Sequence, residues 1–280
     1  IGNFDGLHLG HQEILKTVKK EALKQELEST VISFYPSPAS FLYPKNFKGH
    51  INTDLEKIEK MNSYKIDNFL MLQFDNKIRN MKAEYFLSDI IIKYFNPKTI
   101  IIGYDHRFGY NREGDYDFLN ANKSKYGYNL IKVKEKFFCE NKLSSSNIRR
   151  LLSDRDVKTA AGMLGSLFEI RGEVVKGEGV GRTIGFPTAN IEIDNLKLLP
   201  GNGVYFVSVS IDNGKPFFGM CNIGVRPTVK SNKAVSCEIH IFNFNQIIYE
   251  KALNISFIEF IRLEKKFDSL SCLKKQLIEE

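Results

Sequence analysis

The sequence contains no tryptophan, only four cysteines and no long apolar run. Its most apolar stretch, residues 86–95, is interrupted by Ser88, Asp89 and Lys93, so it does not reach the ~18 apolar residues of a membrane span. The cysteines form no C-x-x-C pair and lack zinc-ligand spacing, which predicts reduced thiols in a cytoplasmic protein. We expect no signal peptide, and because the sequence starts at Ile1 we expect its natural start to be missing.

The composition is that of a globular protein, with 42% hydrophobic and 26% charged residues. A length of 280 residues predicts two domains, which we place at residues 1–165 and 166–280. The net charge of +7 comes from lysines and arginines interspersed with acidic residues, which favours a solvated surface and small anionic substrates. We therefore expect no nucleic-acid or membrane partner, and a monomer or weak self-association.

The first half of the chain alternates predicted strands and helices, which indicates a parallel sheet with helices on both faces. Helical spacing begins after His11, and the other expected elements are helices over 52–64, 83–95 and 156–164 and strands over 30–35, 69–74, 99–103 and 128–133. The second half has short alternating strands and the turn signal Asn213-Gly214, which indicates a small closed antiparallel barrel. Its elements are expected over 169–176, 204–211, 217–223, 235–242 and 252–260, with a final helix from residue 268 or 269.

A glycine-rich run occupies residues 177–190. Glycine lets the backbone approach a ligand and exposes N–H groups that can hold phosphate oxygens. Arg182 adds a charged fork suited to phosphate. Thr188 and Asn190 are two residues apart, so an extended backbone places both oxygens on one face, which suits Mg²⁺. A hairpin loop without a ligand is the alternative, because turns are the commonest use of glycine.

A histidine pair follows a glycine-containing loop at the start of the chain. His8 and His11 are three residues apart where the first helix is expected to begin, so they lie on one face. The helix N-terminus adds free N–H groups and positive potential, and Gly10 leaves room for a nucleotide against the helix. These features suit a triphosphate attacked at its α-phosphorus, while a metal site or a structural role is the alternative.

Other polar features each have a plain structural alternative. Glu238 lies inside an apolar strand, where it could act as a base or simply face solvent. The serines at 144–146 could hold phosphate or cap a helix. The proline-rich segment 36–38 could line a ligand site or form a rigid loop after a strand. Arg262 and Glu264 could form a structural ion pair.

The run over 177–190 resembles the flavokinase signature GxxxGRxxGFPTAN, with every fixed position filled. The opening GNFDGLHLGH resembles the adenylyltransferase half of a bifunctional family, and its HxGH core is shared with class I aminoacyl-tRNA synthetases. Together they resemble the bacterial bifunctional riboflavin kinase/FMN adenylyltransferase family, over nearly the whole chain. The resemblance implies a Rossmann-like nucleotidyltransferase domain followed by a Greek-key β-barrel kinase domain.

Four further stretches match shorter motifs of this family. They are GxDxxFG…RxGD over 103–115, ISSTxIR over 143–149, NIGxRPT over 222–228 and RxExKF over 262–267. Leu143 replaces the Ile and Ser146 replaces the Thr of ISSTxIR, but a hydroxyl remains at 146. His106 is outside the shared positions, and we interpret it as a surface histidine.

The resemblance assigns roles to individual residues. His8 and His11 would stabilise charge on the ATP phosphates, Glu238 would be the catalytic base of the kinase, and Thr188 and Asn190 would be the Mg²⁺ ligands. The residues implied in binding ATP and phosphate are Gly2, Asn3, Phe4, Gly10, Ser144, Ser145, Ser146, Arg149, Gly177, Gly179, Gly181, Arg182, Thr188 and Asn190. Those implied in binding flavin are Pro36, Asp105, Asn222, Arg226, Arg262 and Glu264.

The predicted function is FAD biosynthesis with ATP and Mg²⁺. The second domain would phosphorylate riboflavin to FMN, and the first would transfer AMP from ATP to FMN, giving FAD and pyrophosphate. Three alternatives stay open: an enzyme with one active half, the kinase being favoured, a tRNA-synthetase-like protein, or a non-catalytic flavin-binding or regulatory protein. The absence of a KMSKS-type motif from the sequence disfavours the second.

Overall fold

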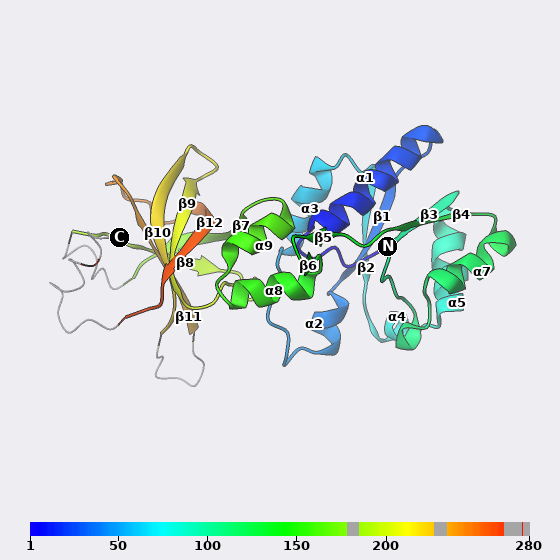
Figure 1. Ribbon diagram of the computed structural model, residues 1–280. Helices are drawn as coiled ribbons and strands as arrows, with labels where there is room; N and C mark the ends of the chain where they lie inside the picture. Colours follow the sequence, from blue (N-terminus) through cyan, green and yellow to red (C-terminus); the bar gives the residue numbers. More distant parts are fainter. Residues whose placement is uncertain (178–184, 227–233, 266–275, 277–280) are drawn as a thin grey trace. The chain divides into compact units, whose positions relative to one another are not determined.

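The structure is a computed structural model that describes residues 1–177, 185–226, 234–265 and 276. The chain divides into two compact units, Ile1–Ser145 and Ser146–Glu280 (Figure 1). The predicted domain boundary between residues 165 and 166 stays a prediction about the two functional domains. The final helix expected from residue 268 or 269 lies outside the described residues.

Two pairs of parallel strands form the sheet structure of the first unit, which confirms the predicted parallel arrangement. They are β1 (Thr30–Tyr35) with β2 (Asn68–Gln73), and β3 (Thr99–Gly103) with β4 (Asn129–Val133). Strands β1 and β3 each bury three consecutive residues, which is the pattern of a strand covered on both faces. Side chains at the carboxyl ends of these strands are therefore available to a ligand site.

Helices and short turns connect these strands. They are α1 (Leu9–Lys24), α2 (Pro38–Leu42), α3 (Asp54–Ser63), α4 (Asn76–Arg79), α5 (Ala83–Tyr85), the π-helical η1 (Phe86–Ile92), α6 (Lys93–Phe95), the 3₁₀ turn η2 (Tyr110–Arg112), α7 (Tyr116–Tyr126), and the hairpin β5 (Phe137–Phe138) with β6 (Asn141–Lys142). The caps follow from the sequence: Thr53 and Glu56 form a capping box on α3. Asp115 caps the start of α7, and Gly127 ends it with a φ of 71°.

The second unit is a closed six-stranded barrel, with strand order β10-β11-β8-β7-β12-β9 and antiparallel pairing throughout (Figure 1). It contains α8 (Ser145–Ser153), whose first residue ends the first unit, α9 (Val157–Leu164), β7 (Phe168–Val175), β8 (Ala189–Ile193), β9 (Gly203–Ile211), β10 (Pro216–Arg226), β11 (Ala234–Ile241) and β12 (Ala252–Arg262). The predicted barrel is confirmed. Strand β8 was not predicted from the sequence.

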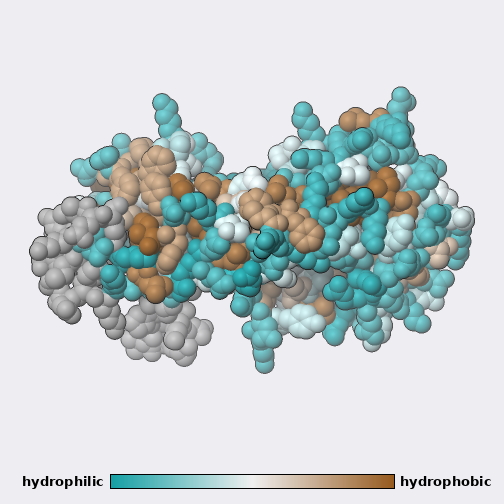
Figure 2. Space-filling view, viewed as in Figure 1, coloured by the Kyte–Doolittle hydropathy of each residue, from teal (hydrophilic) through white to brown (hydrophobic). Residues whose placement is uncertain are grey.

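Alternating burial along the strands separates the barrel interior from its outer face. Fully buried interior residues are Ile170, Tyr205, Val207, Val209, Cys221, Ile223, Leu253, Ile255 and Phe257. A tight turn joins β9 to β10 as predicted, but its two central residues with positive φ are Asp212 and Asn213, one residue earlier than the expected pair Asn213-Gly214. On the outer face, Figure 2 shows apolar residues gathered over β9 and β10, and Phe218 of β10 is exposed.

Candidate active sites

The two histidines of the HxGH motif stack at the start of α1. Their ring centroids are 3.7 Å apart and their planes differ by 19°. His8 is the N-cap of α1, and its Nδ1 accepts a long hydrogen bond of 3.4 Å from the backbone N–H of His11. A neutral imidazole that accepts at Nδ1 carries its proton at Nε2, so His8 presents an N–H donor from Nε2.

Both rings are neutral at pH 7. Burial lowers the pKa of His8 from 6.5 to about 4, although the carboxylates of Asp105 and Asp5 oppose this shift. Burial also lowers the pKa of His11 well below its usual value, and the neighbouring His8 and Lys57 add to that effect. The pair can therefore donate hydrogen bonds but does not act as two cations.

Gly10 packs against the ring of His8, since a Cβ at this position would lie 3.1 Å from it. The absence of a side chain at Gly10 thus allows the stacked arrangement of the histidines. Its predicted role in leaving room for a nucleotide stays a prediction. Among the described residues, no group of three or more His, Cys, Asp or Glu is placed to hold a metal ion, which gives the metal alternative for this pair no support.

The loop before α1 is anchored by buried hydrogen bonds. The Oδ1 atom of Asp5 accepts the backbone N–H groups of Ile51 and Asn52 at 3.0 and 3.2 Å. The hydroxyl of Ser145 donates to the backbone oxygen of Asp5 at 2.8 Å. One of the three predicted phosphate-binding serines therefore holds the histidine loop in place. Ser146 is exposed in the first turn of α8, and Arg149 is half-buried on the same helix.

A cavity of about 870 Å³ opens beside His11 in the first unit. It lies beyond the carboxyl ends of β1, β2 and β3, as expected for a ligand site in a parallel sheet. Five of the residues predicted from the sequence line it: Gly2, Asn3, Phe4, His11 and Asp105. Pro36 is half-buried just after β1 and does not line the cavity, although its neighbour Pro38 does.

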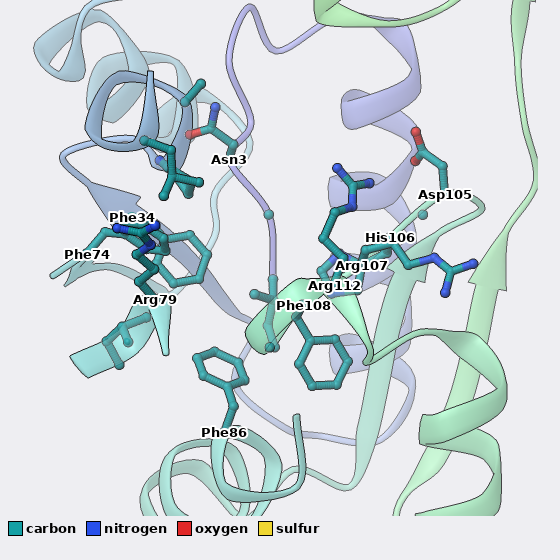
Figure 3. A pocket seen from close by; sticks show the side chains of 18 of the residues that line it. Asn3, Phe34, Phe74, Arg79, Phe86, Asp105, His106, Arg107, Phe108 and Arg112 are labelled. Atoms are coloured by element: carbon teal, nitrogen blue, oxygen red, sulfur yellow. The ribbon is translucent and has the colours of Figure 1, made fainter. Parts of the chain in front are cut away.

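Aromatic and basic side chains form much of the cavity wall (Figure 3). Phe34 and Phe74 meet edge to face at 5.8 Å, and Phe86 and Phe108 have ring centroids 5.6 Å apart. Phe34 is the first residue of an FxPxP arrangement with Pro36 and Pro38, and Phe108 and Arg112 belong to the motif over 103–115, whereas the wall residues Phe74, Arg79, Phe86 and Arg107 were not predicted from the sequence. Phe74 could have been found, because it directly follows β2 and side chains at that end of parallel strands converge. Arg79 ends a helix of only four residues, which has no periodic signal.

His106 is not a surface histidine. It lines the cavity, its ring stacks on Phe108 with centroids 5.7 Å apart, and its Nε2 is buried. Burial lowers its pKa to about 3, with a smaller effect from the positive charge of Arg112. The prediction failed because the turn after β3 points this residue inward, and no periodic pattern reports side-chain direction in a turn.

Four of the predicted kinase residues lie in one row around the outer face of the barrel. Glu238 on β11 lies directly opposite Asn190 on β8 and directly opposite Asn222 on β10. In the same row, Asn222 is opposite Val204 on β9, which in turn is opposite Arg262 on β12. Residues opposite each other on neighbouring strands have Cβ atoms roughly 4.5–5.5 Å apart, so the side chains of Asn190, Glu238 and Asn222 share one site.

The described parts of the glycine-rich run, Gly177 and residues 185–190, contact this row. A Cβ on Gly177 would lie 1.8 Å from Nδ2 of Asn190, so the Asn190 amide packs where a side chain at Gly177 would have to be. The backbone oxygen of Pro187 lies 2.9 Å from Nδ1 of His240, which holds the segment before Thr188 against β11. Thr188 itself is exposed, just before β8 begins.

Asn222 and Glu264 are hydrogen-bonded. Nδ2 of Asn222 donates to Oε1 of Glu264 at 3.0 Å. Arg226 is the last residue of β10, and its side chain is not described. The predicted ATP-binding residues Gly179, Gly181 and Arg182 lie outside the described residues.

Two family models match consecutive parts of the chain. A model described as FAD synthetase matches residues 1–147, and one described as riboflavin kinase matches residues 164–280. A parallel-sheet unit with a histidine pair at a helix start, followed by a barrel with a carboxylate in a polar row, is thus the architecture of a two-domain, phosphate-transferring enzyme.

Curated relatives cover nearly the whole chain. The bifunctional riboflavin kinase/FMN adenylyltransferase of Buchnera aphidicola subsp. Schizaphis graminum is 39% identical over 280 residues, which cover 99% of this chain and 89% of that protein. The protein of the same name from Escherichia coli K12 is 34% identical over 279 residues, or 99% of this chain and 88% of that protein. The chain therefore belongs to the bifunctional riboflavin kinase/FMN adenylyltransferase family, with the two domains in the predicted order.

A crystal structure described as a macrolide-efflux protein from Streptococcus pneumoniae has the same fold. Its TM-score is 0.91 at 33% identity, and the match covers 100% of this chain and 90% of that one. The description as an efflux protein applies to the pneumococcal structure, whereas both family models that match this chain describe enzymes of flavin metabolism. Within the part of the chain that the structure describes, none of the helices has the length and apolar character needed to cross a membrane.

Proposed function

We propose that this chain makes FAD from riboflavin in two ATP-dependent steps at two separate sites. The barrel phosphorylates riboflavin to FMN, and the parallel-sheet unit transfers AMP from a second ATP to FMN. Family membership supports both reactions, and each unit has its own constellation of polar side chains. The observation that carries the proposal is the position of Glu238 between Asn190 and Asn222 in one row of the barrel.

In the kinase step, Glu238 takes the proton of the primary hydroxyl of riboflavin. The hydroxyl oxygen attacks the γ-phosphorus of ATP, the bond to the bridging oxygen breaks, and ADP leaves. Asn190 lies on one side of Glu238 and Asn222 on the other, so the base lies between two amides that can orient phosphate, metal or substrate.

The donor set beside Glu238 fits a hard cation. Thr188 offers a hydroxyl and Asn190 an amide oxygen, and the close approach of Gly177 leaves no competing side chain over the Asn190 amide. When bound there, Mg²⁺ would neutralise charge on the ATP phosphates. Thr188 and Asn190 would hold it, and the exposure of Thr188 leaves its oxygen accessible to the ion.

In the adenylyl step, the FMN phosphate is already an anion, so no base is required. One of its oxygens attacks the α-phosphorus of ATP, and pyrophosphate leaves. Neutral His8 and His11 donate N–H hydrogen bonds to the phosphate oxygens, next to the free N–H groups at the start of α1. The cavity beside His11 has room for the flavin, with aromatic walls for its ring system and arginines for its negative charge.

The two sites can be tested separately in the same chain. Purified protein is incubated with Mg²⁺, ATP and either riboflavin or FMN, and the flavins are separated by chromatography. We expect Glu238→Ala to form no FMN from riboflavin but to convert supplied FMN to FAD. His11→Ala should form FMN from riboflavin and make little FAD. Glu238→Gln is the isosteric control for loss of the base.

Each activity reports on the unit that is proposed to carry it, and thermal unfolding reports whether both units are folded. A variant that loses both activities while its unfolding temperature is unchanged would contradict the two-site proposal. A wild-type chain that forms FMN but no FAD would show that only the kinase half is active. A folded chain that binds flavin and converts none of it would be a flavin-binding protein.

A further inference from the structure

The hydrogen bond between Asn222 and Glu264 fixes the direction of the Asn222 amide. A carboxylate only accepts hydrogen bonds, so the NH₂ group of Asn222 must face Glu264, as it does at 3.0 Å. The carbonyl oxygen Oδ1 must then point to the other side of the amide. Reversing the amide would place two acceptors against each other.

The carbonyl oxygen of Asn222 has no hydrogen-bond partner within the described ranges. It is buried, while the NH₂ group faces the exposed carboxylate of Glu264. A buried acceptor without a donor is costly, so a structure that keeps one has a reason for it. In this row of the barrel the missing donor is most simply a hydroxyl of the substrate, because Glu238 is directly opposite Asn222.

We propose that Asn222 Oδ1 accepts a hydrogen bond from an internal hydroxyl of the riboflavin polyol chain, and that Glu264 is a positioning residue that holds Asn222 in this orientation. This inference rests on the proposed kinase function. It replaces the predicted flavin-binding role of Glu264 with an indirect one. The internal hydroxyls are adjacent to the primary hydroxyl that Glu238 deprotonates, so an acceptor one strand away from Glu238 can bind one of them.

A second, independent observation places Glu264 against the same strand. A Cβ on Gly224 would lie 2.3 Å from Oε1 of Glu264 and 3.0 Å from its carboxyl carbon. Gly224 is two residues beyond Asn222 on β10, so both are on the same face. The carboxylate therefore sits over Gly224 to reach Asn222, and any side chain at residue 224 would displace it.

The test compares two substrates that share the reacting hydroxyl. Riboflavin has the full polyol chain, whereas 10-(5-hydroxypentyl) flavin keeps the terminal hydroxyl and lacks the internal ones. The variants are Asn222→Ala, Glu264→Ala, the double variant, Glu264→Gln and Gly224→Ala. We expect Asn222→Ala and Glu264→Ala each to lower kcat/KM for riboflavin about tenfold, as for the loss of one hydrogen bond, and to leave the analogue nearly unaffected.

The remaining variants test whether Glu264 acts through Asn222. The double variant should be no worse than Asn222→Ala, because Glu264 has no effect once the amide is gone. Glu264→Gln should fall between wild type and Glu264→Ala, since a glutamine amide accepts either orientation of Asn222. Gly224→Ala should behave like Glu264→Ala. Phosphorylation of the analogue by the same variant reports that its barrel is folded.

Three outcomes would overturn the inference. Equal losses for both flavins in Asn222→Ala would show that Oδ1 does not bind an internal hydroxyl. Additive losses in the double variant would show that Glu264 acts on its own. Unchanged kinetics in Glu264→Ala would remove its role entirely. A wild-type chain that phosphorylates neither flavin would instead contradict the proposed function itself, and this inference with it.

Discussion

His8 and His11 stack with their ring centroids 3.7 Å apart, and the first of them also caps the helix that carries the second. Close stacking and burial both oppose protonation, so the pair is held neutral where two positive charges would repel each other. A neutral imidazole can still donate a hydrogen bond from its N–H group, and it avoids the free-energy cost of burying a charge. The cap also fixes which nitrogen of His8 carries the proton.

Because His8 is neutral in the fold, the free energy of unfolding of the protein depends on pH. Its pKa is about 4 in the fold and 6.5 when unperturbed, so the unfolded chain binds the proton more readily between these values. Stability is therefore complete above pH 6.5 and is lost as the pH falls toward 4, by roughly 3 kcal/mol in total. We predict that His8→Asn, which keeps a capping oxygen but does not titrate, loses less stability on acidification.

Urea unfolding of both proteins at pH 7 and pH 4.5 measures this effect. For each protein, the unfolding free energy at pH 4.5 is subtracted from that at pH 7. This difference should be larger for wild type than for His8→Asn, whatever their absolute stabilities. Parallel loss of stability in the two proteins would mean that His8 is not the buried group that responds to acid. His106, which also has a lowered pKa, contributes equally to both proteins and cancels from the comparison.

The contact between Gly177 and Asn190 predicts a selective kinase defect. A methyl group at residue 177 would occupy the place of the Asn190 amide, so Gly177→Ala must displace that amide from the row that contains Glu238. We predict that riboflavin phosphorylation falls at least about tenfold, since small displacements of positioned groups are costly in catalysis. Conversion of supplied FMN to FAD should not change. Equal losses in both reactions would point to misfolding.

Elements with a clear hydrophobic pattern could be predicted from the sequence. The expected strands over 30–35 and 99–103 coincide with β1 and β3, and α9 begins after its capping Asp156 and ends before Gly165, as the sequence indicated. These elements have strong local signals: runs of buried residues, a side-chain cap and a left-handed glycine. Strand β8 was missed because it is short and directly follows the glycine-rich run.

The candidate sites were predictable only where a motif marks them. The row around Glu238 contains Asn190 and Asn222, both found from the sequence, but their register across three strands is a tertiary property. The cavity wall was mostly missed, because its aromatic residues are far apart in sequence and have no shared spacing. The inward direction of His106 depends on the local turn, which apolar periodicity does not report.

Two left-handed glycines in the first unit make a matched pair of variants. Gly109 and Gly127 have φ values of 75° and 71°, so alanine is strained by similar amounts at both. A Cβ at Gly109 would lie 2.7 Å from backbone atoms of Ala83, whereas nothing lies within 4 Å of a Cβ at Gly127. We predict that Gly127→Ala lowers the free energy of unfolding by about 1 kcal/mol. Gly109→Ala should lower it by at least about 2 kcal/mol more.

Gly109 also lines the cavity, so its variant should weaken FMN binding as well. Thermal unfolding gives the stabilities, and quenching of flavin fluorescence gives the affinity for FMN. Gly127→Ala should bind FMN as wild type does, because Gly127 does not line the cavity. Equal destabilisation in the two variants would show that the fold around Ala83 relaxes to admit the extra methyl group.

The proposed cation ligands predict that the two reactions respond differently to Mg²⁺. Removing the hydroxyl in Thr188→Val, or the amide oxygen in Asn190→Ala, should raise the Mg²⁺ concentration needed for half-maximal riboflavin phosphorylation by about tenfold or more. The requirement for FAD formation from FMN should stay the same, because neither residue is in the first unit. Binding of Mn²⁺ with ADP, followed by electron paramagnetic resonance, tests the same site without turnover. If Thr188→Val and Asn190→Ala bound the ion as tightly as wild type, the cation would be held by other groups, and the close packing of Asn190 on Gly177 would serve the shape of the loop alone.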